Sequence, residues 1–243
     1  MGCPIDNLSF EETLECIEGF VENGGNHYQI SINVHKLLNY RSDPAMREVV
    51  ERADLLSVDG QPVLWASYLL GTPLKARVAG IDLMEALITR SAKRGWRVFF
   101  LGARPEVVER VTDRYRREFP ELRIAGSRDG YWTSAEEKGV VDAVHAAEPD
   151  VLFVAISSPK KEHFIRQHLE RLNVPFVMGV GGSFDVMAGI TRRAPRWVRH
   201  IGFEWFWRFL QEPRRMWRRY FVEDMRFLLV LASELIKRRR INR

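Results

Sequence analysis

Small polar residues and glycines follow several of the short apolar runs in this sequence. Five such stretches are Ser31-Ile32-Asn33, Asp59-Gly60, Gly102, Ser157–Lys160 and Gly179–Asp185. A glycine after a strand lets backbone N–H groups approach phosphate oxygens, and the start of a following helix adds its dipole. Each stretch alone is more typical of a tight turn. Gathered at one edge of a sheet, they would form a site for a phosphorylated ligand.

Asp59 is the residue that we single out as a candidate general base. It follows the apolar run Leu55–Val58, so its carboxylate is expected at the mouth of a pocket, where partial burial would raise its pKa. Asp-Gly is also a common turn pair, and taken alone this simpler interpretation would prevail. Asp82 is instead expected in the first turn of a helix over Ile81–Lys93.

The sequence predicts neither a metal ion nor a cofactor. His163 and His168 lie five residues apart and would not share a helix face, and the other histidines also lack metal-ligand spacing. No Asp-x-Asp pair occurs, so arginine, lysine and backbone donors would have to neutralise a nucleotide-linked diphosphate. Gly179–Phe184 lacks the third glycine of a dinucleotide fingerprint, which argues against a nicotinamide-dependent oxidoreductase.

Strands and helices alternate over residues 1–190 and must position these side chains. Apolar runs predict strands over Tyr28–Val34, Leu55–Val58, Arg97–Leu101, Val151–Ile156 and Phe176–Val180, and a weaker one over Arg123–Ser127. Helical patterns cover Asp43–Ala53, Ile81–Lys93, Pro105–Glu118, Ser134–Ala147 and Lys160–Leu172. We therefore predict an α/β fold: a Rossmann-like, mostly parallel sheet with helices on both faces. In such sheets, ligands bind beyond the carboxyl ends of the strands.

Residues 191–243 differ in composition and are predicted to form a basic helical appendage to the domain of residues 1–190. From Arg192 onward there are fourteen Arg and one Lys against four Glu and one Asp, although the whole chain carries only +5. Four of the seven tryptophans lie among these arginines. Such a segment suits an anionic membrane surface and equally suits single-stranded nucleic acid, so composition leaves both partners open.

The sequence also indicates where the protein works. Cys3 and Cys16 are the only cysteines, which favours a reducing cytoplasm over a disulfide-linked secreted protein. No signal peptide is visible, and the longest uncharged apolar runs are too short to span a bilayer. We therefore expect a soluble or peripheral protein.

In their order along the chain, these motifs resemble the WecG/TagA/CpsF glycosyltransferase family. The matching stretches of the body are Ser31-x-Asn33, Val58-Asp59-Gly60, Arg77–Leu83, Phe99–Gly102, Asp129-Gly130-Tyr131, Ser158–Glu162 and Gly179–Asp185. Those of the basic segment are Arg193–Trp197, Glu204-Trp205, Arg208 and Gln211–Arg215. The resemblance covers nearly the whole chain.

The resemblance implies an inverting, metal-independent transfer of a sugar, N-acetylmannosamine by family default, from a UDP donor to a sugar on undecaprenyl diphosphate. The work would be done on the inner face of the cell membrane, for teichoic acid or another surface polysaccharide. The implied catalytic residues are Asp59 as base, with Ser31 and Asn33 beside it. The residues implied for UDP are Gly102, Tyr131, Ser158, Lys161, Gly181, Gly182 and Asp185. Those implied for the acceptor diphosphate are Arg77, Arg208, Arg215 and Arg218.

Two positions depart from the family pattern. Ser31 stands where many members have threonine and keeps the hydroxyl. Lys161 replaces the glutamine of Pro-Lys-Gln-Glu, which puts a compact cation into a pocket that handles diphosphates. Lys161 would bind phosphate or a donor carboxylate, so glucose or a uronic acid stays open as the transferred sugar.

A nucleic-acid-binding protein is the main alternative function. It would explain the basic segment but leaves the motifs at the strand ends without a role. We therefore expect no nucleic acid among the partners, and leave a homo-oligomer open.

Overall fold

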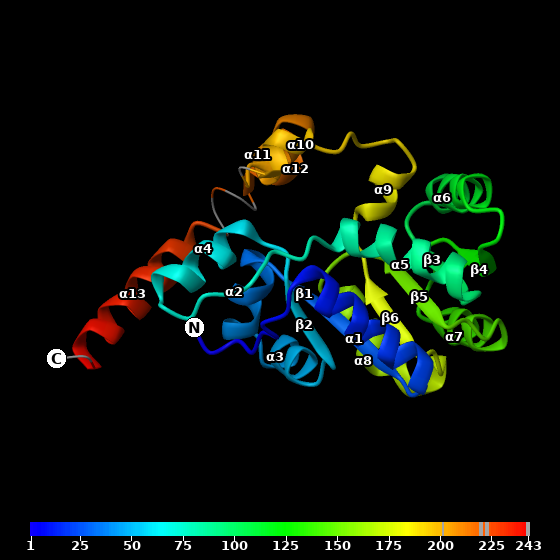
Figure 1. The fold of residues 1–243 in the computed structure, drawn as a ribbon, viewed down its shortest axis with the longest axis horizontal. Coiled ribbons are helices and arrows are strands. Elements are labelled where there is room, and N and C mark those ends of the chain that lie inside the picture. The colour runs from blue at the N-terminus through cyan, green and yellow to red at the C-terminus, as the bar shows by residue number, and fades with distance from the viewer. Residues whose placement is uncertain (201, 219–220, 222–223, 242–243) are drawn as a thin grey trace.

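A parallel sheet of six strands forms the centre of the protein (Figure 1), in the order β2-β1-β6-β5-β3-β4. The computed structural model describes residues 1–200, 202–218, 221 and 224–241, without the side chains of residues 196, 200, 215, 218 and 239–241. The strands are β1 (His27–Ile32), β2 (Leu55–Val58), β3 (Arg97–Gly102), β4 (Arg123–Arg128), β5 (Val151–Ala155) and β6 (Phe176–Gly179). Each of the six predicted strands is confirmed. The largely apolar runs of β2, β3, β5 and β6 are typical of a sheet covered on both faces.

Helices cover both faces of the sheet, and each face has its own buried core. The helices of one face are α1 (Phe10–Asn23), α5 (Gly80–Arg94), α6 (Pro105–Glu118) and α9 (Ser183–Met187). Those of the other face are α2 (Val34–Ser42), α3 (Pro44–Glu51), α4 (Gln61–Leu69), α7 (Glu137–Ala146) and α8 (Lys160–Leu172). The predicted fold class, a Rossmann-like α/β sheet with helices on both faces, is confirmed.

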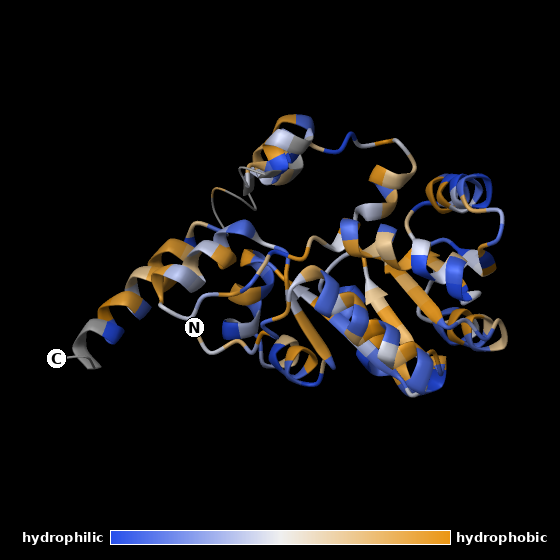
Figure 2. Ribbon diagram, in the orientation of Figure 1, coloured by the Kyte–Doolittle hydropathy of each residue, from blue (hydrophilic) through white to orange (hydrophobic). Residues whose placement is uncertain are grey.

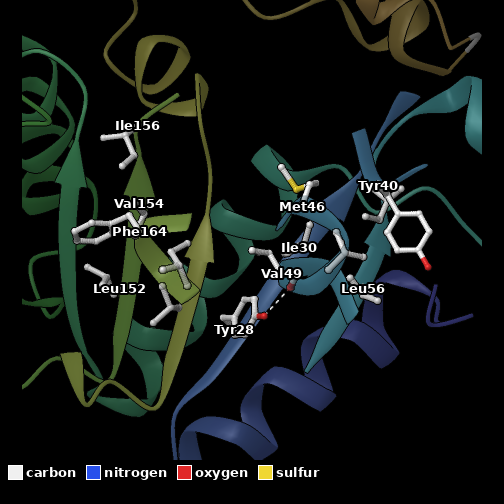
Figure 3. Packing of buried hydrophobic residues seen from close by; sticks show 14 of the residues in the cluster. Tyr28, Ile30, Tyr40, Met46, Val49, Leu56, Leu152, Val154, Ile156 and Phe164 are labelled. Carbon is white, nitrogen blue, oxygen red and sulfur yellow. Dashed lines mark hydrogen bonds between the residues drawn. The ribbon is translucent and has the colours of Figure 1, made fainter. Parts of the chain in front are cut away.

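The strands and the inward faces of the helices are the hydrophobic parts of the ribbon (Figure 2). Figure 3 shows the core on the α2, α3 and α8 face, where Ile30, Val154 and Phe164 pack together. The buried hydroxyl of Tyr28 donates a hydrogen bond of 2.6 Å to the carbonyl oxygen of Val49, so this aromatic ring is buried without an unpaired polar atom.

The helices were predicted less completely than the strands. Pro105–Glu118 and Lys160–Leu172 match α6 and α8, and Asp82 lies in the first turn of α5 as predicted. The helix predicted from Ser134 begins later, at the first residue of α7. The reason is a turn in which the carboxylate of Glu136 accepts hydrogen bonds from the N–H and the hydroxyl of Thr133. Helices α1, α2 and α4 were not predicted.

The C-terminal part of the chain is helical, as predicted. It contains α10 (Arg196–His200), α11 (Glu204–Gln211), α12 (Pro213–Arg218) and α13 (Arg226–Ile241), and α12 begins at Pro213, a residue that suits the first turn of a helix. Helices α10, α11 and α12 lie together beyond α9, whereas α13 runs beside α2 and α4 (Figure 1). Glu234 of α13 pairs with Arg41 at 3.1 Å, and Arg238 contacts Gly71 after α4. The division into two domains at residue 190 stays a prediction.

Within the described ranges, none of the helices combines the length and the apolar character that crossing a membrane requires.

Candidate active site

The carboxyl ends of all six strands lie at one edge of the sheet, because the strands are parallel. The residues singled out from the sequence follow these ends. They are Ser31 and Asn33 at the end of β1, Asp59 after β2, Gly102 at the end of β3, Tyr131 after β4, Ser158 after β5, and Gly181, Gly182 and Asp185 after β6. The fold therefore brings the candidate residues of the body to the same edge.

Ser31 and Asp59 face a common space above Gly80. Strands β1 and β2 are neighbours, and the N–H of Asp59 donates to the carbonyl oxygen of Ile32 at 3.0 Å. A Cβ atom added to Gly80 would lie 3.6 Å from Oγ of Ser31 and 3.8 Å from Oδ2 of Asp59. The missing side chain of Gly80 thus leaves room between two oxygens that can both bind a ligand hydroxyl.

Gln29 orients the hydroxyl of Ser31 through a buried hydrogen bond. The buried amide nitrogen Nε2 of Gln29 donates to Oγ of Ser31 at 2.9 Å and to Oγ of Ser57 at 2.6 Å. Because Oγ of Ser31 accepts this bond, its own O–H proton is the group that remains to be donated. We did not predict Gln29 from the sequence. The signal that could have found it is an amide within an apolar strand, two residues before Ser31 and therefore on the same face.

Asp59 has the electrostatic character expected of a base. Its side chain is partly buried, and burial raises the pKa of Asp59 above its usual range. The positive charge of Arg77 opposes this shift, whereas the negative charge of Glu204 adds to it. Lys36 and the N–H of Gly80 lower the pKa further, without reversing the direction. The shift is in the direction predicted from the sequence.

Asn33 caps a helix at this edge of the sheet. Its Oδ1 accepts a hydrogen bond of 3.0 Å from the N–H of Lys36 and so caps the N-terminus of α2. The side-chain oxygen of Asn33 is therefore used by the helix cap, and its side-chain NH₂ group is available to donate a hydrogen bond to a ligand. Gly60 is required beside it, since a Cβ atom there would lie 3.1 Å from the Cα atom of Asn33.

Lys161 lies under the glycine turn that follows β6. A Cβ atom on Gly179 would lie 2.6 Å from Cε of Lys161, and one on Gly181 would lie 3.6 Å from its Nζ. Lys161 is almost fully buried and lies 3.4 Å from Oε1 of Glu162, which also pairs with Lys36 at 3.0 Å. Burial alone would raise the pKa of Glu162, but the two lysines outweigh it and hold that pKa at about 2. The glycines thus accommodate the lysine that replaces the family's glutamine.

Arg208 of α11 lies over the same turn. A Cβ atom on Gly182 would lie 2.6 Å from Nη2 of Arg208 and 3.8 Å from Oδ2 of Asp185. The backbone of Gly181 has a positive φ of 54°, a conformation that suits glycine. The structure therefore places Arg208 beside residues predicted for the donor, although the sequence assigned it to the acceptor diphosphate. That assignment stays a prediction.

Gly102, Tyr131 and Ser158 lie further along the edge. Gly102 has a φ of +116°, and a Cβ atom there would lie 2.6 Å from the carbonyl carbon of Ala155, so glycine is needed for β3 and β5 to approach. The Tyr131 side chain is 70% exposed. Oγ of Ser158 is buried without a hydrogen-bond partner among the described residues. Their contact with UDP stays a prediction.

The arginines predicted for the acceptor diphosphate are described in part. Nη1 of Arg77 donates a hydrogen bond of 3.2 Å to Oε2 of Glu204, the first residue of α11. Arg215 and Arg218 belong to α12, but their side chains lie outside the described residues.

A network of ion pairs attaches α10 and α11 to the first turns of α5. Arg193 pairs with Asp82 at 2.6 Å, with Glu85 at 3.5 Å and with Glu204 at 3.8 Å. Arg199 pairs with Asp82 at 3.5 Å. Sequence reasoning missed this network, although a basic segment after a mildly acidic body was a signal for it. The network holds the appendage over the edge that carries Asp59.

Across the described parts of the chain, histidine, cysteine, aspartate and glutamate side chains form no group of three or more that could hold a metal ion.

An α/β sheet with polar side chains at the carboxyl ends of its strands is typical of enzymes that bind phosphorylated ligands, and comparison with known proteins identifies this chain as a glycosyltransferase. The chain belongs to the glycosyl transferase WecG/TagA/CpsF family, whose model matches residues 1–241. It is also similar to the N-acetylglucosaminyldiphosphoundecaprenol N-acetyl-beta-D-mannosaminyltransferase of Bacillus spizizenii (strain ATCC 23059 / NRRL B-14472 / W23). The two are 38% identical over 177 residues, which cover 73% of this chain and 68% of the relative. The resemblance found in the sequence is confirmed.

Proposed function

We propose that the protein transfers N-acetylmannosamine from a UDP donor to N-acetylglucosamine on undecaprenyl diphosphate, with inversion at the anomeric carbon and without a metal ion. The family and the name of the Bacillus relative support the transferred sugar and the acceptor. The observation that carries the proposal is that Oγ of Ser31 and Oδ2 of Asp59 both border the space left by the missing side chain of Gly80. This space suits one attacking hydroxyl.

In the proposed reaction, Asp59 accepts the proton of the acceptor hydroxyl while that oxygen attacks the anomeric carbon of the donor. The new glycosidic bond forms as the bond between the anomeric carbon and the diphosphate oxygen breaks, and UDP leaves with the electron pair. A single displacement inverts the configuration. A carboxylate with a raised pKa suits a base of this kind, since its proton affinity then lies closer to the working pH. The hydroxyl of Ser31, oriented by Gln29, donates to an oxygen of the bound sugars.

The leaving diphosphate would be neutralised by protein donors. Arg208 over the turn at Gly181 and Gly182 supplies a guanidinium, and the turn itself supplies backbone N–H groups. Lys161 beneath the turn adds a second cation. Tyr131, Ser158 and Asp185 would hold the remainder of the UDP. Arg77, Arg215 and Arg218 would meet the diphosphate of the acceptor lipid.

The appendage would dock the enzyme on the inner face of the cell membrane. The charge of residues 192–243 attracts anionic lipid, at about 1 kcal/mol for each basic residue near the surface. Large apolar side chains of this segment are also exposed, among them Trp197, Trp217 and Leu229. Tryptophan and arginine together suit the headgroup region. The enzyme would then meet its lipid-linked acceptor at the membrane surface.

A panel of UDP-sugars with a synthetic polyprenyl-diphosphate N-acetylglucosamine acceptor tests the proposal. We expect turnover with UDP-N-acetylmannosamine to exceed turnover with UDP-glucose or a UDP-uronic acid by at least about tenfold, which is about 1.4 kcal/mol of discrimination. Faster turnover with either of the other donors would contradict the assignment of the sugar. In a thermal-shift control, UDP at 100 times its Kd should add about 2.7 kcal/mol of stability, whereas an oligonucleotide should add none.

A further inference from the structure

Glu204 connects the appendage to the catalytic edge through two arginines. Its Oε2 lies 3.2 Å from Nη1 of Arg77, and its Oε1 lies 3.8 Å from Nε of Arg193. Arg77 comes from the segment between α4 and α5, whereas Arg193 precedes α10. All three side chains are partly buried, so solvent screens these charges less than it would on an open surface. One carboxylate of the appendage therefore holds an arginine of the body.

Arg77 is a close neighbour of Asp59 through the backbone. The N–H of Val78 donates a hydrogen bond of 2.7 Å to the carbonyl oxygen of Val58, and these two residues directly adjoin Arg77 and Asp59. A long guanidinium side chain rooted at this point has two carboxylates within its range, those of Asp59 and Glu204. An Arg–carboxylate pair is strong where it is shielded from water, so an arginine without Glu204 would turn to the other carboxylate.

We propose that Glu204 is a positioning residue of the reaction: it holds the guanidinium of Arg77 toward the acceptor side and keeps it from pairing with Asp59. The inference rests on the proposed function, in which Asp59 is the base. Through Glu204, the appendage would then influence the base itself, which its arginines do not do. A positive charge close to Asp59 would stabilise its carboxylate and so weaken it as a base.

The charges around Asp59 agree with this role. Burial raises the pKa of Asp59, and Glu204 on α11 raises it further, whereas Arg77 lowers it. The other groups that face Asp59 are Lys36 on α2 and the N–H of Gly80 at the start of α5, and both also lower its pKa. Removing the charge of Glu204 takes away a negative charge that raises the pKa of Asp59. It also frees Arg77, whose positive charge lowers that pKa. Both effects have the same sign.

The test compares Glu204→Gln with Glu85→Gln in the full-length enzyme. Glu85 is the matched control, since it also pairs with Arg193, at 3.5 Å, and its other ion pair among the described residues is with Arg114, at 3.8 Å, rather than with Arg77. The measurement is kcat against pH with a short, soluble acceptor. We expect Glu204→Gln to lower the maximal kcat, the plateau of this curve, about tenfold. We also expect its acid limb, where kcat falls with falling pH, to move to lower pH by at least about half a unit. Glu85→Gln should leave the acid limb at its wild-type position, because Glu85 is not among the charges that shift the pKa of Asp59.

An acid limb of Glu204→Gln within about 0.2 pH unit of wild type would overturn the inference, even if the plateau fell, because a merely structural loss changes the plateau alone. If Glu204→Gln does not fold, the neutral pair Arg77→Gln/Glu204→Gln is compared with Arg77→Gln. No further loss of kcat supports the inference, and a further tenfold loss overturns it.

The proposed function is tested separately in the same assay by Asp59→Asn. Full activity of Asp59→Asn would contradict both the assignment of the base and the inference. An inactive Asp59→Asn together with an unshifted limb in Glu204→Gln would overturn the inference alone.

Discussion

Replacing Gly80 by alanine should separate stability from activity. The added methyl group would lie 3.6 Å from Oγ of Ser31, 3.8 Å from Oδ2 of Asp59 and 3.9 Å from Cε of Met178. These are ordinary van der Waals distances, and Gly80 is the first residue of α5 without a positive φ, so the fold accepts the change. Alanine is the better helix former, by up to about 1 kcal/mol, so we expect the melting temperature to hold or to rise by one or a few degrees, about 2–4 °C for each kcal/mol.

Activity should fall because the methyl group would crowd an acceptor hydroxyl bound by Ser31 and Asp59. An oxygen that bonds to both lies about 2.8 Å from each, and the added carbon would border the same two oxygens at 3.6 and 3.8 Å. Displacing the hydroxyl by about 1 Å typically costs on the order of 100-fold in rate. We therefore expect kcat to fall about 100-fold with a soluble acceptor, while UDP binding stays near that of wild type.

Gly139 provides the matched control. It lies within α7, and a Cβ atom added there meets nothing within 4 Å. Gly139→Ala should give a similar gain in melting temperature with no change in kcat. If Gly80→Ala kept more than about half of wild-type kcat, the attacking hydroxyl would not lie between Ser31 and Asp59, and the site would have to be rebuilt around other residues.

Three further predictions test other parts of the mechanism. Asp59→Asn should leave folding and UDP binding nearly intact but lower kcat by about 100-fold or more, and retention of over a third of the activity would remove Asp59 from the mechanism. Activity should survive excess EDTA, whereas loss on chelation that Mg²⁺ or Mn²⁺ restores would show that a metal neutralises the diphosphate. Neutralising the cluster Lys237-Arg238-Arg239-Arg240 should weaken binding to anionic vesicles, and the difference from wild type should grow as the salt concentration falls. Activity with a soluble acceptor should not change. Vesicle binding equal to that of wild type would assign docking to other residues.

Most of the sheet was predictable from the sequence because β2, β3, β5 and β6 are largely apolar runs, whose burial on both faces needs no knowledge of tertiary contacts. Helix α1 was predictable in principle, since Ser9 and Glu12 form the capping box that precedes it, with Glu12 Oε2 2.7 Å from the N–H of Ser9. Helix α2 was not, because the polar residue that caps it, Asn33, was interpreted only as part of the site.

The position of a candidate residue was predictable where it depends on its own strand. Asp59 was placed at the edge from its position after β2, since a strand end fixes both the edge and the partial burial. The bond from Gln29 to Ser57, 28 residues away, and the bond from Glu204 to Arg77, 127 residues away, were not predicted. Periodicity and local motifs carry no information about such distant pairs.

The burial of Phe227 bears on how the chain may be shortened. This residue of α13 is 3% exposed and belongs to the same core as Ile30, Leu37 and Val154. Losing a buried phenylalanine side chain typically costs about 3–5 kcal/mol, a large part of the 5–15 kcal/mol that stabilises a folded domain. A protein ended at Arg192 would therefore melt well below the full chain. The unit that unfolds cooperatively thus extends past the change in composition that marks the appendage, and a shortened enzyme needs α13 or a substitute for Phe227.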